Sequence, residues 1–406
     1  DNFPAFLLMA IIVALFMGLT VSAEEIIRDR KILKRESFLN LSWNSYLFSK
    51  LNILFLLSAI QTLTFVVVGN LILEVHGITF SMWLVLFTTA CFANVLGLNI
   101  SSAFNSAVTV YVMIPLLLIP QMILSGLLFP FDKLNDLISA KGKVPIIADL
   151  MASRWAYEAL AVDQFKNNDY ESMFYEYHRE EAKADFKSAH LTDELIKRNR
   201  FIADNFESKN DSIKKLVAHN ILILKDNLQS EPYREGLEKI NFDSYSPDQA
   251  KSLEGYLENY RSHYQKIYNN NVNMIERKMA FLENKKGIVI NDEKNIYYNE
   301  SLGDMVKNVG VTDRLIEHNG KLIQQINPIF QEIHPSGIFD YRTAFFVPEK
   351  NLFGLTISTF VFDLIVVWIM TLGCYLALYF EWLRKLVEFF GNVRIPDRVN
   401  IPFKRK

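Results

Sequence analysis

One acidic residue, Asp363, lies well inside an apolar stretch of this chain, where residues 351–383 contain no Lys or Arg. A carboxyl group within hydrocarbon is costly to bury, and such residues commonly serve transport or gating. A neutral acid that hydrogen-bonds inside a helix bundle is the structural alternative. No Lys or Arg of the predicted spans could pair with it, so we expect its partner to be an amide side chain or to lie in a further span before Asp1. The candidate amides are Asn70, Asn94, Asn99 and Gln121.

The chain lacks several catalytic signatures. The dipeptides Gly142-Lys143 and Gly320-Lys321 lack the first Gly and the hydroxyl residue of a phosphate-binding loop, so an ATPase site is not expected in these residues. Glu176, His178, Glu180 and Glu181 lack zinc-ligand spacing, and we expect no metal site. Basic residues of the charged region are outnumbered and unclustered, so we expect no nucleic-acid partner.

Long apolar segments must position these residues. The 82 residues from Leu51 to Asp132 contain no Lys or Arg. In a bilayer such segments form spanning helices. We predict five spans, at Phe3–Ser22, Leu51–Leu73, Ile78–Leu98, Ala107–Phe129 and Leu352–Phe380, the last running past the bilayer as a continuous helix.

The fold class is therefore an all-α polytopic transmembrane domain with a large helical insert before the last span. We divide the chain into a membrane domain at 1–130, an insert at 131–350, a last span at 351–390 and a basic tail at 391–406. Cys91 and Cys374 both lie in apolar spans, and no disulfide is expected in the insert.

Basic residues outside the insert indicate the orientation. They lie only in the first connection and in the tail, which we therefore place in the cytosol. The connection carries Arg28, Arg30, Lys31, Lys34, Arg35 and Lys50; the tail carries Arg384, Lys385, Arg394, Arg398, Lys404, Arg405 and Lys406. Alternation then places the insert and the N-terminus outside, and implies a further span before Asp1.

Two segments near the spans suggest mechanism. Glu24–Glu36 carries charges of alternating sign, typical of a rigid cytosolic helix that docks on a partner or of a juxtamembrane helix among lipid headgroups. The fourth span and its outer end, read over Tyr111–Phe131, contain three prolines and the Ser125-Gly126 pair, which predict kinks and a break near that end. Broken helices at membrane depth are found against protein or a cavity, so this span lines a pathway or is a kinked packing helix.

Three stretches together resemble the membrane domain of ATP-binding cassette exporters of the G-subfamily type, in the bacterial form whose ATPase domain is N-terminal. They are Glu24–Glu36 with the following residues 41–50, then Ser125–Pro130, then Ser153–Leu160. The match covers about residues 1–165 and 345–390. The outer loop before the last span is far longer here than is usual in that family.

The resemblance implies a homodimer with two ATPase domains, fused or separate, which bind ATP and Mg²⁺. It also implies a multi-pass protein of the bacterial inner membrane, with a pathway at the dimer axis. The residues implied to face that pathway are Ala10, Val13, Ala14, Met17, Pro115, Leu118, Ile119 and Met122. Leu127 and Leu128 would form an apolar plug. Coupling to the ATPase would involve Glu24, Arg28, Asp29, Arg30, Arg35 and Glu36.

The insert shows helical periodicity, with its longest run at about Pro247–Glu283. Heptad spacing there predicts either a coiled-coil arm that holds a periplasmic partner or a long helix packed within its own bundle. The resulting hypothesis is the permease part of an ATP-driven exporter with alternating access. The alternative is a membrane-anchored interaction protein in which ATP hydrolysis drives a mechanical change without cargo passage.

Overall fold

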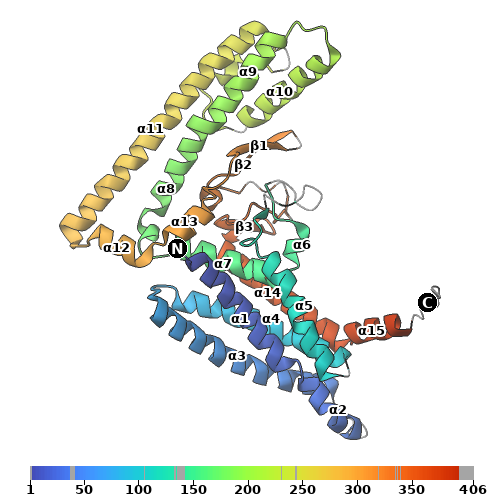
Figure 1. Cartoon of the computed structure of the whole chain (residues 1–406). Helices are drawn as coiled ribbons and strands as arrows, with labels where there is room; N and C mark the ends of the chain where they lie inside the picture. Colours follow the sequence, from blue (N-terminus) through green and yellow to red (C-terminus); the bar gives the residue numbers. More distant parts are fainter. Residues whose placement is uncertain are drawn as a thin grey trace, which may run out of the picture.

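A bundle of apolar helices forms the lower part of the computed structural model (Figure 1). The structure describes residues 2–36, 42–104, 106–131, 134, 142–229, 231–242, 245–318, 320–333, 335, 337–338 and 340–392. The bundle helices within these ranges are α1 (Phe3–Ser22), α3 (Trp43–Leu73), α4 (Thr79–Ala103), α5 (Ala107–Ile123) and α14 (Thr359–Tyr379). The predicted polytopic helical architecture is confirmed.

Length separates α5 from the other bundle helices. Among the described residues, α1, α3, α4 and α14 are long and apolar enough to cross a membrane, whereas α5 has 17 residues. Pro115 and Pro120 lie inside α5, and the helix ends at Ile123 rather than at the predicted Phe129. Its last turn is followed by Gly126, whose φ of 92° reverses the chain.

Close backbone contact joins α1 to the central helix α4, which also packs against α3 and α14. Gly18 allows this approach, because a Cβ atom there would lie 2.7 Å from both the carbonyl oxygen of Ala90 and the Cβ of Ala93. Small residues permit such packing in membranes, where no hydrophobic force drives helices together. The amide of Asn94 donates to Ser58 Oγ at 2.7 Å and links α4 to α3.

The last span is shorter than predicted. Its first expected residues form an antiparallel hairpin of β3 (Glu349–Leu352) and β4 (Leu355–Ser358), and α14 begins only at Thr359. The helix ends at Tyr379, and Glu381, with φ of 53°, separates it from α15 (Trp382–Asn392). The prediction of one continuous helix was wrong, because left-handed residues interrupt the chain. The basic tail beyond Asn392 lies outside the described residues.

The remaining elements form the insert and the connections. They are α2 (Glu25–Glu36), α6 (Ile146–Asp149), α7 (Ala152–Lys166), α8 (Glu171–Asp185), η3 (Phe186–Leu191), α9 (Thr192–Asn205), α10 (Asp211–Gln229), η4 (Leu237–Lys239), α11 (Pro247–Lys286), α12 (Ile290–Tyr297), α13 (Glu300–Val306), β1 (Leu315–His318), β2 (Lys321–Gln324) and η5 (Pro328–Phe330). Figure 1 shows α2 at one end of the bundle and the long insert helices beyond the other.

The heptad positions of α11 pack inside the insert. Leu253, Leu257, Tyr260 and Tyr264 are buried in a core shared with α9 and α10. Farther along, the Lys278 ammonium donates to the carbonyl oxygen of Met173 in α8. The contacts therefore favour a helix packed within its own bundle over a free coiled-coil arm.

We predict that Gly18→Ala lowers the free energy of unfolding by about 1–3 kcal/mol, the usual cost of overpacking a tight contact. The thermal unfolding midpoint of the purified protein in detergent measures this. Gly373→Ala in α14 is the matched control, because a Cβ there meets no atom within 4 Å. Equal midpoints for the two variants would show that the α1–α4 contact is looser than described.

Candidate functional site

Helix α2 is fastened to the end of α4. The Arg30 guanidinium donates to the carbonyl oxygens of Ser102, at 2.7 Å, and Phe104, at 2.8 Å. The Ser101 hydroxyl accepts from the backbone N–H groups of Ile26, at 3.1 Å, and Ile27, at 3.2 Å. The Arg30 bonds satisfy carbonyls at the end of α4, and Ser101 satisfies N–H groups at the start of α2, which helix ends leave without partners. A displacement of α2 is therefore transmitted to α4.

A second set of contacts fastens α2 to α3. The Lys50 ammonium lies 2.6 Å from Glu25 Oε2 and 2.7 Å from Asp29 Oδ2. The Tyr46 hydroxyl donates to Asp29 at 3.0 Å. Glu25, Tyr46 and Lys50 were not among the predicted coupling residues, although their charges and spacing were visible in the sequence.

The predicted coupling residues divide into inward and outward groups. Asp29 and Arg30 bind the neighbouring helices, whereas Arg28, paired with Glu25, has 67% of its side chain exposed. Arg35 is also exposed, Glu24 is half-buried, and the side chain of Glu36 lies outside the described ones. The outward group thus faces solvent, and the inward group holds α2 to α3 and α4.

The residues implied to face a pathway do not share one environment. On α1, Ala10 and Ala14 are buried within the protomer, whereas Val13 and Met17 are partly exposed. On the neighbouring α5, Pro115 and Ile119 are exposed. Leu118 and Met122 are partly exposed. Among the residues implied to face the pathway, the more accessible side chains are therefore those of α5.

The break after α5 is held by α7. Gln121 is buried: its side-chain oxygen accepts from the N–H of Ser153 at 3.0 Å, and its carbonyl oxygen accepts from the Ser153 hydroxyl at 2.5 Å. These bonds join α5, just before the stretch Ser125–Pro130, to the start of the stretch Ser153–Leu160. Beyond the break, Leu127 is half-buried against the bundle core, and Leu128 is half-exposed.

Asp363 belongs to a buried charge cluster of Arg154, Glu158, Lys350 and Asp363, each no more than 2% exposed. The Lys350 ammonium lies 2.8 Å from Asp363 Oδ1 and also contacts Glu158. Arg154 pairs with Glu158 at 3.0 Å. The expectation of an amide partner was wrong for Asp363, since the hairpin β3–β4 brings Lys350 from outside the helix.

The amides expected to bind Asp363 have other partners. Asn99 donates to the carbonyl oxygen of Cys374 at 2.9 Å, and Asn70 donates to Thr79 Oγ1 at 3.2 Å. Asn94 and Gln121 bind α3 and α7, as described above. These contacts tie neighbouring helices together rather than solvating a charge.

Aromatic rings and a backbone amide complete the buried charge cluster. The Arg154 guanidinium lies 3.6 Å from the centre of the Trp155 ring, and the Lys350 ammonium lies 4.8 Å from it. The N–H of Phe346 donates to Glu158 Oε1 at 3.2 Å. Two cations and two anions thus neutralise one another without water-exposed partners, and α7, β3 and α14 are fixed together.

Asp149 of α6 lies at the edge of this cluster, 3.8 Å from Arg154 Nη1. Burial raises the pKa of its carboxyl group, and the guanidinium groups of Arg154 and Arg342 act in the opposite direction. Arg154 therefore faces one carboxylate inside the buried charge cluster and another at its rim.

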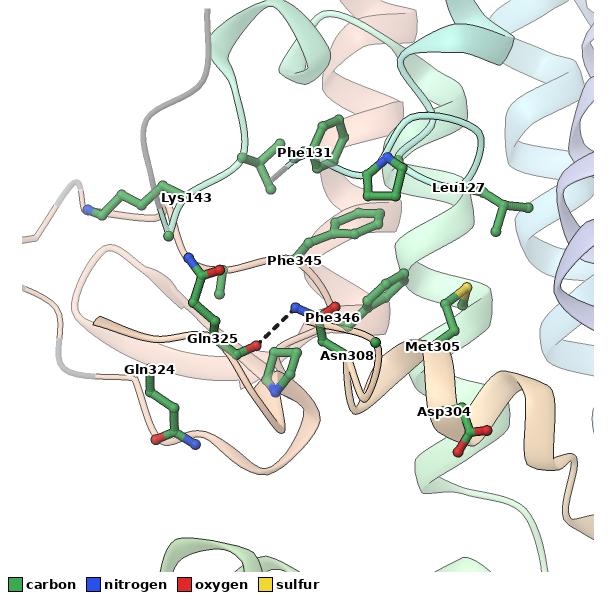
Figure 2. A pocket seen from close by; sticks show the side chains of 17 residues that line it. Leu127, Phe131, Lys143, Asp304, Met305, Asn308, Gln324, Gln325, Phe345 and Phe346 are labelled. Atoms are coloured by element: carbon green, nitrogen blue, oxygen red, sulfur yellow. Dashed lines mark hydrogen bonds between the residues drawn. The ribbon is translucent and has the colours of Figure 1, made fainter. Parts of the chain in front are cut away.

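An apolar cavity of about 370 Å³ lies beyond Leu127 (Figure 2). Its walls come from the segment after α5, from residues 344–346 and from the part of the insert around α13 and β2. The segment after α5 and the insert therefore line one partly open cavity.

We predict that Lys350→Met lowers the free energy of unfolding by about 3–5 kcal/mol, because it leaves Asp363 buried without its cation. Adding Asp363→Leu should recover part of that loss. Lys166→Met is the control, since Lys166 makes only a half-exposed pair with Glu349 at 3.9 Å. The denaturation midpoints of the single variant, the double variant and the control measure these changes in stability.

For Asp363→Asn, both the denaturation midpoint and the transport activity are measured, so that an effect on transport can be told from an effect on stability. If the Asp363 charge takes part in gating, this variant alters transport activity beyond the change that its stability explains. Activity equal to that of the unsubstituted protein would assign Asp363 to structure alone.

Comparison with known families agrees with this geometry. Residues 1–165 match the family model described as ABC-2 type transporter, which spans α1 to α5, the coupling contacts and nearly all of α7. No curated protein and no solved structure matches the chain. Membrane domains of this family are the permease components of ABC transporters, and they act with a nucleotide-binding ATPase component in a lipid bilayer. The resemblance inferred from the sequence is confirmed over residues 1–165, which match the membrane domain of ABC-2 type transporters, and the apolar helices agree with a multi-pass membrane protein.

Proposed function

We propose that this chain is the permease part of an ATP-driven exporter that works as a homodimer. Its ATPase domain would lie on a further segment or on a separate chain, and ATP and Mg²⁺ would bind there. The observation that carries the proposal is the position of α2: it directly follows α1, binds α3 and α4, and keeps Arg28 and Arg35 toward solvent.

In this mechanism, closure of two ATPase domains pushes on α2. Arg30 passes the movement to α4, Lys50 passes it to α3, and α1 receives it through the chain. The α1 and α5 helices then change their tilt, and the apolar space between the two protomers narrows. Cargo is forced past Leu127 and Leu128. ATP supplies the energy. The closed pair of ATPase domains binds more tightly to the tilted arrangement of the helices than to the resting one, and so favours it.

The resemblance implies a bacterial inner membrane, and charge patterning supports the orientation that we propose there. The Lys and Arg residues outside the insert lie at the α2 end of the bundle or follow α14, which is the pattern of a cytosolic face. The insert lies at the opposite end, so this orientation places it outside the cytosol (Figure 1).

A second function is favoured by the buried charge cluster. It joins α14 to α7, and α7 in turn contacts the insert, where the Tyr157 hydroxyl lies 3.0 Å from the Met305 sulfur. A tilt of the bundle could thus move the insert and any periplasmic partner without cargo passage. Reconstituted vesicles distinguish the two functions, because only an exporter accumulates or releases cargo when ATP is added.

We predict that Arg28→Glu and Arg35→Glu uncouple ATP hydrolysis from transport. Both side chains face solvent, so charge reversal weakens docking without disturbing the bundle. ATPase rate and transport rate, measured on the same vesicles, give the coupling ratio. Lys197→Glu, whose side chain in the insert is 81% exposed, is the matched reversal. Unchanged coupling in both α2 variants would remove α2 from the mechanism.

We predict that replacing Leu127 and Leu128 together by Ala raises both the leak of cargo and the basal ATPase rate. The smaller side chains would leave the outer end of the pathway open. Leu56 and Leu71 on the exposed face of α3 supply a matched double replacement by Ala. Rates equal to those of the unsubstituted protein in both assays would contradict the plug.

A further inference from the structure

The cavity beyond Leu127 has the size and lining of a small-molecule site. Its volume of about 370 Å³ is within the range of ligand pockets, which are mostly apolar with a few placed polar groups. Phe131, Phe345 and Phe346 form one wall, with ring centres of Phe131 and Phe345 5.0 Å apart and those of Phe345 and Phe346 4.0 Å apart. Figure 2 shows Leu127 and Met305 on the side toward the bundle.

Loose packing does not account for this space. Gly126, which lines it, has a φ of 92°, and a Cβ there would lie 2.5 Å from the ring of Phe345. Gly142, on another wall, has a φ of 76°, and a Cβ there would lie 2.5 Å from Ile323. The walls are thus packed to contact around an interior that remains open.

The polar groups of the cavity are mainly amides. Asn308 donates through its side chain to the carbonyl oxygen of Gln325 at 3.0 Å, and Gln324 donates to the carbonyl oxygen of Ile326 at 2.8 Å. Their side-chain oxygens and second N–H groups can pair with a ligand. The lining therefore favours a molecule whose polar end forms hydrogen bonds without carrying charge.

The two charged lining residues do not alter this preference. Lys143 is paired with Asp340 at 3.4 Å, and Asp304 is exposed. Figure 2 shows the ammonium of Lys143 and the carboxylate of Asp304 turned away from the aromatic rings. Neither charge therefore stands inside the apolar space to recognise an ion.

We propose that this cavity binds the apolar chain of an amphipathic molecule with an uncharged polar head. Resting on the proposed function, we infer that the occupant is exported cargo that has just passed Leu127. Leu127 belongs to the proposed plug and also lines the cavity, so cargo that passes the plug reaches the cavity next. The apolar chain of the cargo, once inside the cavity, is not exposed to water and avoids the free-energy cost of that exposure.

Part of the cavity lining comes from the insert, outside the segment that matches the transporter family. Met305, Asn308, Gln324, Gln325 and Pro328 all lie outside the 165 residues that match the family. The insert thus supplies the polar end of the site, and the segment after α5 supplies part of the apolar end. Cargo recognition would depend on a part of this chain that the family does not define.

Photolabelling of the full chain, together with its ATPase, in lipid nanodiscs tests the site. The probe is a monoacylglycerol with a diazirine on its acyl chain, and mass spectrometry maps the labelled peptides. We expect labelling at residues 126–131 and 344–346, in addition to lipid-facing positions on α3. A matched fatty acid with an anionic carboxylate should label the cavity several-fold less.

Ala344→Trp fills the cavity from a half-buried wall position. The ring would displace at least two methylene groups of the bound chain, so cavity labelling should fall about tenfold. Labelling near the exposed Leu56 of α3 should not change. If Ala344→Trp lowers the unfolding midpoint, the smaller replacement Ala344→Phe is used in its place.

The outcomes separate the two proposals. Loss of cavity labelling and of ATP-driven transport in Ala344→Trp supports the cargo site. Label on α3 without label in the cavity overturns the site. Equal labelling of the cavity by the anionic probe overturns the preference for an uncharged head. Loss of label with normal transport overturns the link to export. Cavity labelling in a protein that transports nothing instead contradicts the proposed function.

Discussion

The ion pair between Lys350 and Asp363 is the contact on which the outer end of the bundle depends. Neither charge can be left alone in an apolar environment, because the cost of desolvation is several kcal/mol per ion. Lys350 therefore has to arrive with the hairpin, Asp363 with α14, and Arg154 and Glu158 with α7. The chain crosses the insert between α7 and the hairpin, so the insert can fold only in a way that returns Lys350 to this place. The pair links the fold of the insert to that of the membrane domain.

The opposite end of the bundle uses the same physical rule with different residues. Arg30 satisfies the final carbonyls of α4, and Lys50 joins two acids of α2 to α3. Between the two ends, contacts are made by small and weakly polar groups such as Gly18 and Ser58. Strong, directional contacts at the ends and weak ones between them allow whole helices to tilt while their ends stay attached. That mechanical property suits a permease that changes shape without unfolding.

The sequence predicted the membrane helices well, because hydrocarbon excludes Lys and Arg from any spanning segment. It failed at the start of the last span, since residues 352–358 carry no charge and include Leu352, Phe353, Leu355 and Ile357. Phe353 and Gly354, both with positive φ, make the turn, and Gly354 was the only visible sign of it. The partner of Asp363 could not be predicted for the same reason: Lys350 reaches it only through that hairpin. The cavity beyond Leu127 needed contacts between segments more than 150 residues apart, which no local pattern reports.

The position of the insert limits how transport and mechanical transmission can be combined. Met305 contacts Tyr157 of α7 and also lines the cavity, while the Tyr175 hydroxyl donates to the carbonyl oxygen of Ile329 at 2.8 Å. The wall formed by the insert is thus fixed to α7 and α8, whereas the wall formed by Gly126 and Leu127 follows α5. If α5 tilts and α7 does not, the cavity must change its volume. If both move together, the cavity keeps its volume and the insert moves instead. The stiffness of the Gln121–Ser153 contact between α5 and α7 therefore decides which of the two motions occurs.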